Sequence, residues 1–155
     1  MNAGPYSNEN VQKFLEEEFV PLKSQCFWDK RTELMKQFDI AWTPTFLFHD
    51  SSGKVHRKLV GYLPTDDYVA QLKFGKGLIF FEKERHEESL KWFQRVIDDH
   101  PESGVAPEAV FYKGVAKYKK THEASALRRA YDALSEKYPL NEWARRAGAY
   151  ATIPK

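Results

Sequence analysis

A proline directly before an apolar run constrains the fold of this sequence more than any other feature. Pro44 precedes residues 45–48, Thr-Phe-Leu-Phe, a run that is typical of a buried β-strand. Proline has no N–H to donate to a β-ladder, so it is tolerated at the first residue of a strand and rarely inside one. The turn-rich residues 49–53 then lead to residues 54–61, where polar and apolar side chains alternate. The pattern predicts a β-hairpin over about residues 45–61.

The chain before the hairpin shows two helical patterns separated by a strand pattern. Apolar residues at helical spacing predict a first helix over about residues 8–17, and Ser7 is its expected N-cap. A short strand over residues 19–27 and a second helix over residues 29–37 are expected to follow. After the hairpin, Thr65 is the expected N-cap of a third helix.

Beyond Leu72 the sequence has helical periodicity and no convincing strand pattern. The helical segments alternate with short breaks, as in stacked antiparallel helix pairs, and span residues 75–83, 87–99, 107–119, 124–137 and 142–148. Gly77 and Gly114 occupy positions where paired helices are expected to approach closely, and Phe93 is the expected aromatic of a second helix. Two pairs are fewer than the three that such repeats usually need. We therefore expect this region to be stabilised by the N-terminal half or by another chain.

Composition and charge exclude several classes of function. Lys and Arg together number 24 and Asp and Glu 22, so the net charge of +2 gives no reason to expect nucleic acid or an anionic membrane as partner. No apolar run approaches the ~20 residues that span a bilayer. Residues 1–6 lack the basic and apolar regions of a secretory signal, which predicts a cytoplasmic location.

The cysteine and histidine content predicts neither a metal site nor a cofactor. Cys26 is the single cysteine, which excludes an internal disulfide and a cysteine-only metal site. A free cysteine is among the most buried residue types, so we expect Cys26 to be buried rather than reactive. The five histidines show none of the spacings typical of metal ligands.

Taken in order, these motifs resemble bacterial thioredoxin-fold proteins that carry a C-terminal tetratricopeptide (TPR)-like helical extension. The residues that carry the resemblance are Val11–Leu22, Phe38–Phe48, Gly53, Gly61–Pro64 and the helices from Gly77 onward. The resemblance implies an α/β fold class. It also implies an incomplete thioredoxin-like domain over residues 1–73, with two helices, one strand plus a β-hairpin and one helix. An all-α TPR-like repeat region over residues 74–155 is implied to follow.

The same resemblance implies a peptide-binding site at Trp42, Thr43 and Pro44. In the family the X-Pro bond is cis, and the backbone of the residue before proline pairs with an extended peptide. Thr43 would supply that backbone here. Trp42 is as well suited to line a groove as to pack against the core.

The sequence departs from the family before its first helix. A first strand and a Cys-x-x-Cys helix precede the part of the fold that begins here at Met1, and this chain has neither. The missing strand would lie between the strand at residues 19–25 and the hairpin. Three remedies are open: the remaining strands pair directly, a second copy covers the open sheet edge in a homodimer, or the native product begins upstream.

Two functions follow from these alternatives, with a third of a structural kind. The first is a redox-inactive module that binds an unidentified protein or peptide. The second is a thiol–disulfide oxidoreductase of the thioredoxin family, whose Cys-x-x-Cys segment lies outside this chain. The third is self-association through the open sheet edge.

Overall fold

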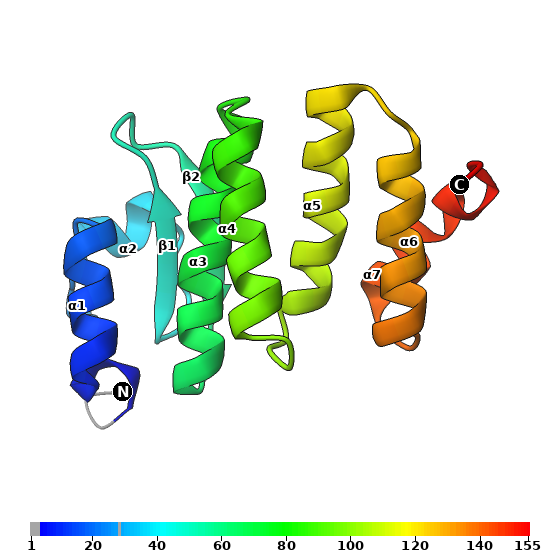
Figure 1. Ribbon diagram of the computed structural model, residues 1–155. Helices are drawn as coiled ribbons and strands as arrows, with labels where there is room; N and C mark the ends of the chain where they lie inside the picture. The colour runs from blue at the N-terminus through cyan, green and yellow to red at the C-terminus, as the bar shows by residue number, and fades with distance from the viewer. Residues whose placement is uncertain (1–3, 28) are drawn as a thin grey trace. The chain divides into compact units, whose positions relative to one another are not determined.

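The computed structural model describes residues 4–27 and 29–155. The chain divides into two compact units that meet between Thr65 and Asp66. The domain boundary expected after residue 73 falls inside one continuous helix, α3, which runs from Thr65 to Glu82. The fold is mixed α/β, with a β-hairpin in the first unit and helices throughout the second (Figure 1).

The first unit contains short helices and one hairpin. Its elements are the 3-10 helix η1 (Pro5–Ser7), α1 (Glu9–Glu18), α2 (Glu33–Gln37), β1 (Thr45–His49) and β2 (Val55–Val60). The N-cap of α1 is Asn8 rather than Ser7, because the Asn8 side chain accepts hydrogen bonds from two backbone N–H groups of the first turn. The Ser7 hydroxyl instead donates to the Gly4 carbonyl at 2.9 Å. The second helix is shorter than expected, since Thr32 caps it only at Glu33.

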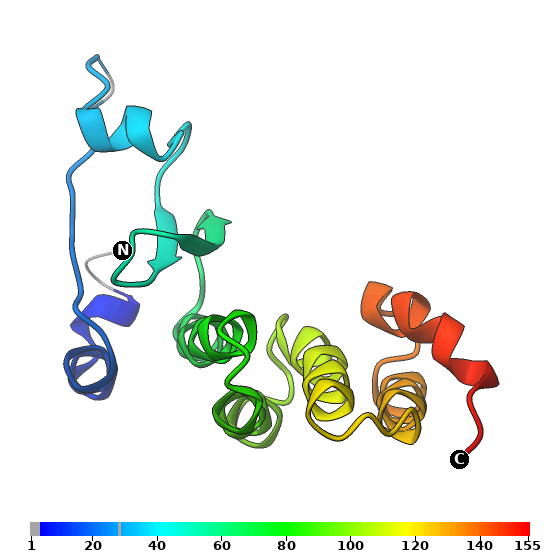
Figure 2. The ribbon, with the colours of Figure 1, turned by 90° about the horizontal axis from the view of Figure 1, so that it is seen from above.

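The strand expected over residues 19–27 does not form. This segment leaves α1 without an assigned strand, and the sheet consists of β1 and β2 alone. Figure 2 shows it as an unpaired stretch between α1 and α2. Val20 and Leu22 are 99% and 80% exposed, so their apolar side chains have no layer to pack against. A strand needs a neighbour to satisfy its backbone, and the described part of the chain offers none at this place.

The hairpin has one packed face. Phe48 is buried and its ring lies 6.3 Å from that of Phe19, just after α1. Phe46, on the same face, lies 6.4 Å from the Tyr6 ring. The alternation of side chains along β1 therefore turns Phe46 and Phe48 toward the segment that contains η1 and α1.

The second unit is a row of antiparallel helices. It comprises most of α3, then α4 (His86–Asp99), α5 (Ala106–Thr121), α6 (Ser125–Lys137), α7 (Glu142–Arg146) and the 3-10 helix η2 (Ala147–Thr152). Consecutive helices lie side by side in both ribbon views (Figures 1 and 2). Phe74, Phe93 and Val96 are fully buried at the centre of one core cluster, and Leu134 is the fully buried centre of another.

Two glycines allow the helices of this unit to approach closely. A Cβ atom on Gly77 would lie 2.5 Å from the Phe93 ring, and one on Gly114 would lie 2.4 Å from the Ala130 Cβ. Both distances are too short for real contacts. The expectation that Gly77 and Gly114 mark helix crossings is therefore confirmed.

A polar chain ties the start of α3 to the end of α4. The buried His100 donates from Nδ1 to the Asp66 carboxylate at 2.7 Å, and its Nε2 accepts from Lys73 Nζ at 2.9 Å. Lys73 also donates to Asp99 at 2.6 Å, and this hydrogen bond lowers the pKa of Asp99 below its ordinary value. The ionised form of Asp99 is thus favoured by folding.

Gly114→Ala tests the crossing of α5 and α6. We expect it to lower the free energy of unfolding by about 1–2 kcal/mol, because overpacking costs about 1–3 kcal/mol and the better helix propensity of alanine returns up to about 1 kcal/mol. Gly148→Ala is the control, since nothing lies within 4 Å of its added Cβ. In a double-mutant cycle followed by urea unfolding, Ala130→Gly should offset part of the Gly114→Ala loss. Equal stability of Gly114→Ala and the wild type would contradict the close approach.

Asp99→Asn tests the Lys73–Asp99 pair by its pH dependence. A carboxyl with a lowered folded-state pKa contributes stability above its unfolded pKa and loses that contribution as the pH falls through the folded value. The wild type should therefore lose more stability between pH 5 and pH 2.5 than Asp99→Asn, as measured by urea unfolding at each pH. The same loss in both proteins would show that Asp99 is not coupled to folding.

Candidate functional site

The turn that follows α2 is fixed by two basic side chains. Arg31 donates from Nη2 to the carbonyls of Met35 and Ile40, both at 3.3 Å, and Lys58 of β2 donates to the carbonyls of Phe38 and Asp39. Cations beside the carbonyl end of a helix satisfy groups that have no partner within the helix. The chain therefore leaves α2 in a defined direction and reaches Trp42 by way of the buried Ile40.

The segment Trp42-Thr43-Pro44 forms an exposed loop at the start of β1. The Thr43–Pro44 peptide bond is cis. The Thr45 hydroxyl donates to the Trp42 carbonyl at 2.6 Å, and Gly61 N–H donates to the Pro44 carbonyl at 2.8 Å. Trp42 is 58% exposed, so its ring lies at the surface of the first unit rather than in the core.

The register of the hairpin determines which backbone groups of β1 are available. Opposite residues in an antiparallel pair alternate between exchanging hydrogen bonds and pointing their N–H and C=O groups outward. The bond from Gly61 to Pro44, with the pairing of Phe46 with Leu59, places Pro44, Phe46 and Phe48 in the bonded positions. Thr45 and Leu47 must then direct their backbone groups away from β2.

Thr43 extends this unpaired edge into the loop. It lies just before β1, and within the described part of the chain neither of its backbone groups forms a hydrogen bond. Thr43, Thr45 and Leu47 together are called the β1 edge from here on. The edge is a row of donors and acceptors with no described strand beside it.

A shallow cavity of about 380 Å³ lies next to the loop. Trp42 and Thr43 form one side of it, and Arg31, Met35 and the half-buried Cys26 contribute to the rest. Sequence reasoning missed Arg31 and Met35 because it assigned residues 29–37 to a helix by periodicity alone. The sequence did offer one signal, the position of Arg31 just before the Thr32 cap. From there a long basic side chain can extend along a short helix to its carbonyl end.

The described residues hold neither a metal cluster nor a membrane-spanning helix. No three side chains among His, Cys, Asp and Glu gather there to hold an ion. None of the described helices combines the length and apolar character needed to cross a bilayer.

Comparison with known families agrees with this geometry. Residues 6–76 match the family model of a thioredoxin-like domain. The match covers the hairpin, the Trp42–Pro44 loop and the first turns of α3, so the structure is a thioredoxin-like domain followed by a helical region. No curated protein and no solved structure matches the chain.

The three residues predicted for the site are neighbours in sequence, and the structure adds what surrounds them. Trp42 lines the cavity, Thr43 lies at the beginning of the β1 edge, and the Pro44 carbonyl accepts a hydrogen bond from Gly61, the residue after β2. Their role in peptide binding stays a prediction.

Proposed function

We propose that this chain is a redox-inactive binding module that takes an extended peptide on the β1 edge. The observation that carries the proposal is the outward direction of the Thr45 and Leu47 backbone groups, next to the backbone groups of Thr43 that form no hydrogen bond. A peptide laid along them adds a third strand to the sheet, in the binding mode called β-augmentation. Each backbone hydrogen bond formed in this way contributes roughly 0.5–1.5 kcal/mol net.

Trp42 and the adjoining cavity supply side-chain selectivity in this proposal. A strand directs alternate side chains to opposite faces, so one side chain of the bound peptide lies over the cavity while its neighbours point away. The lining by Trp42, Met35 and Ile40 favours an apolar side chain there. An exposed tryptophan ring is a common anchor in protein interfaces because it buries a large area on binding.

The cysteine content supports a binding role without electron exchange. The chain has one cysteine, and dithiol exchange needs a nucleophilic and a resolving thiol. Cys26 alone cannot close an internal disulfide. In an insulin-reduction assay this chain should therefore give the rate of the buffer blank.

We further propose that the helical region is TPR-like. The features that support this are two successive helix pairs, α3 with α4 and α5 with α6, each with a glycine at its crossing. Buried Ala144 and Ala147 in the last turns are compatible with a capping role for α7 and η2.

A second candidate is a thiol–disulfide oxidoreductase of which this chain is a part. Two observations together favour it. The β1 edge has no described strand beside it, and residues 19–27 form no strand and leave Val20 and Leu22 exposed. Both would gain a neighbour from one additional strand. Translation of the DNA upstream of Met1 in frame decides the matter, because a strand followed by Cys-x-x-Cys supports this candidate and a stop codon removes it.

Binding of a synthetic strand peptide tests the proposed module. The probe is a fluorescein-labelled eight-residue peptide of alternating threonine and valine, followed by fluorescence anisotropy with the full chain. Two control peptides have the same sequence with N-methyl groups, one on every threonine and the other on every valine, so that each loses the N–H donors of one edge. The unmodified peptide should bind at least tenfold more tightly than the more weakly binding of these two controls.

Trp42→Ala should weaken this binding about fivefold or more, whereas Tyr118→Ala, which removes an exposed ring from the second unit, should leave it unchanged. Equal affinity for the unmodified and both N-methylated peptides would contradict β-augmentation. An unchanged affinity of Trp42→Ala would contradict the role of the loop.

A further inference from the structure

Helices α4, α5 and α6 line a second, larger concavity in the helical unit. Its volume is about 790 Å³, and α5 lies between α4 and α6 as Figure 2 shows. Five basic residues line it, and we name it the basic groove after them: Lys91, Arg95, Lys113, Lys117 and Arg129. No acidic residue is part of the lining.

The cations of the basic groove form no close ion pair, unlike other cations of this unit, although Lys91 helps to lower the pKa of Glu88 and Arg95 that of Asp99. Lys73, Arg85, Lys120, Arg128 and Arg146 each form an ion pair with an aspartate or glutamate. Within residues 66–155, all of which are described, none of the five cations of the basic groove forms one.

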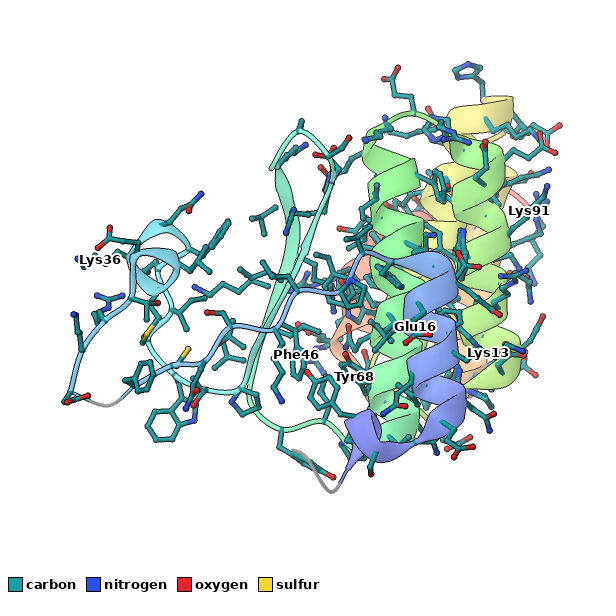
Figure 3. All side chains as sticks on the ribbon, turned by 90° about the vertical axis from the view of Figure 1, so that its left-hand side faces the viewer. Lys13, Glu16, Lys36, Phe46, Tyr68 and Lys91 are labelled. Atoms are coloured by element: carbon teal, nitrogen blue, oxygen red, sulfur yellow. The ribbon has the colours of Figure 1, made fainter. Side chains whose placement is uncertain are left out.

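Two of the groove cations make other contacts. Arg95 lies over the Trp92 ring at 4.6 Å, and Arg129 donates to the Ser125 hydroxyl at 3.1 Å. Lys91 projects outward from α4 (Figure 3). Lys91, Lys117 and the other exposed cations of the groove thus keep donors directed at solvent.

The floor of the basic groove is apolar and carries no aromatic ring. It is formed by aliphatic and small side chains from all three helices, namely Leu90, Ile97, Val110, Ala126 and Ala130. The close approach of α5 and α6 at Gly114 removes side-chain bulk from the middle of the floor. A ligand that places aliphatic groups in this space gains binding free energy, because their apolar surface is removed from water.

We propose that the basic groove binds an acidic protein segment in which glutamate or aspartate residues flank aliphatic ones. Five like charges around one concavity raise the local potential, which attracts carboxylates and is relieved when they bind. The aliphatic floor selects a peptide over a single-stranded nucleic acid, since nucleic acids are held by aromatic platforms on which the bases stack. This site lies in the helical unit and is independent of the β1 edge.

The test uses the full chain and a fluorescein-labelled twelve-residue peptide of glutamate and leucine, measured by fluorescence anisotropy. The groove variant is Lys113→Glu/Arg129→Glu. Its matched control is Lys83→Glu/Lys137→Glu, which makes the same change in net charge at exposed positions outside the groove, one of them on the same helix as Arg129. We expect at least a tenfold loss of affinity for the groove variant and less than a threefold loss for the control.

A peptide of opposite charge distinguishes a loss of the groove's positive charge from misfolding of the groove variant. A peptide of lysine and leucine should bind the groove variant more tightly than it binds the wild type, which an unfolded protein would not reproduce specifically. Trp42→Ala should bind the acidic peptide with wild-type affinity. The proposal is overturned if the wild type does not bind the acidic peptide, if both double variants lose affinity equally, or if oligothymidylate binds more tightly than the peptide.

Discussion

The unpaired outer edge of β1 is the constraint on which the first unit depends. A two-stranded hairpin satisfies only alternate backbone groups of each strand, and such a hairpin alone is marginal in water. Phe46 and Phe48 compensate on one face by packing against Tyr6 and Phe19. No described strand forms hydrogen bonds with the β1 edge. An added strand would therefore form new backbone hydrogen bonds at Thr43, Thr45 and Leu47.

The helical unit is held together by close packing of neighbouring helices, and this packing also forms the basic groove. The missing side chains at Gly77 and Gly114 leave room for the Phe93 ring and for the Ala130 Cβ of the neighbouring helices. The groove lined by α4, α5 and α6 consequently holds small and aliphatic groups together with five cations. The small residues that let these helices pack closely therefore also shape the groove for which ligand binding is proposed.

The sequence was sufficient for features that depend on local pattern. Pro44 before an apolar run indicated the hairpin, and helical periodicity indicated α4 to α6 to within a few residues. The strand expected over residues 19–27 failed because strand propensity is local, whereas a ladder needs a partner that lies elsewhere in the chain. The choice of Asn8 over Ser7 as N-cap was equally undetermined, since both side chains are good caps. The sequence does not show which cations line the basic groove, because they come from three helices and only the packing of these helices shows that they share one concavity.

Amide hydrogen exchange along β1, resolved by NMR on the monomeric chain, tests the central claim most directly. The account predicts that the Leu47 amide exchanges at least tenfold faster than the amides of Phe46 and Phe48, which are bonded to β2 in the observed register. The Leu47 amide should then become protected when a strand peptide binds. Protection of Leu47 equal to that of Phe46 in the free monomer would show that the edge is already occupied and would contradict the account.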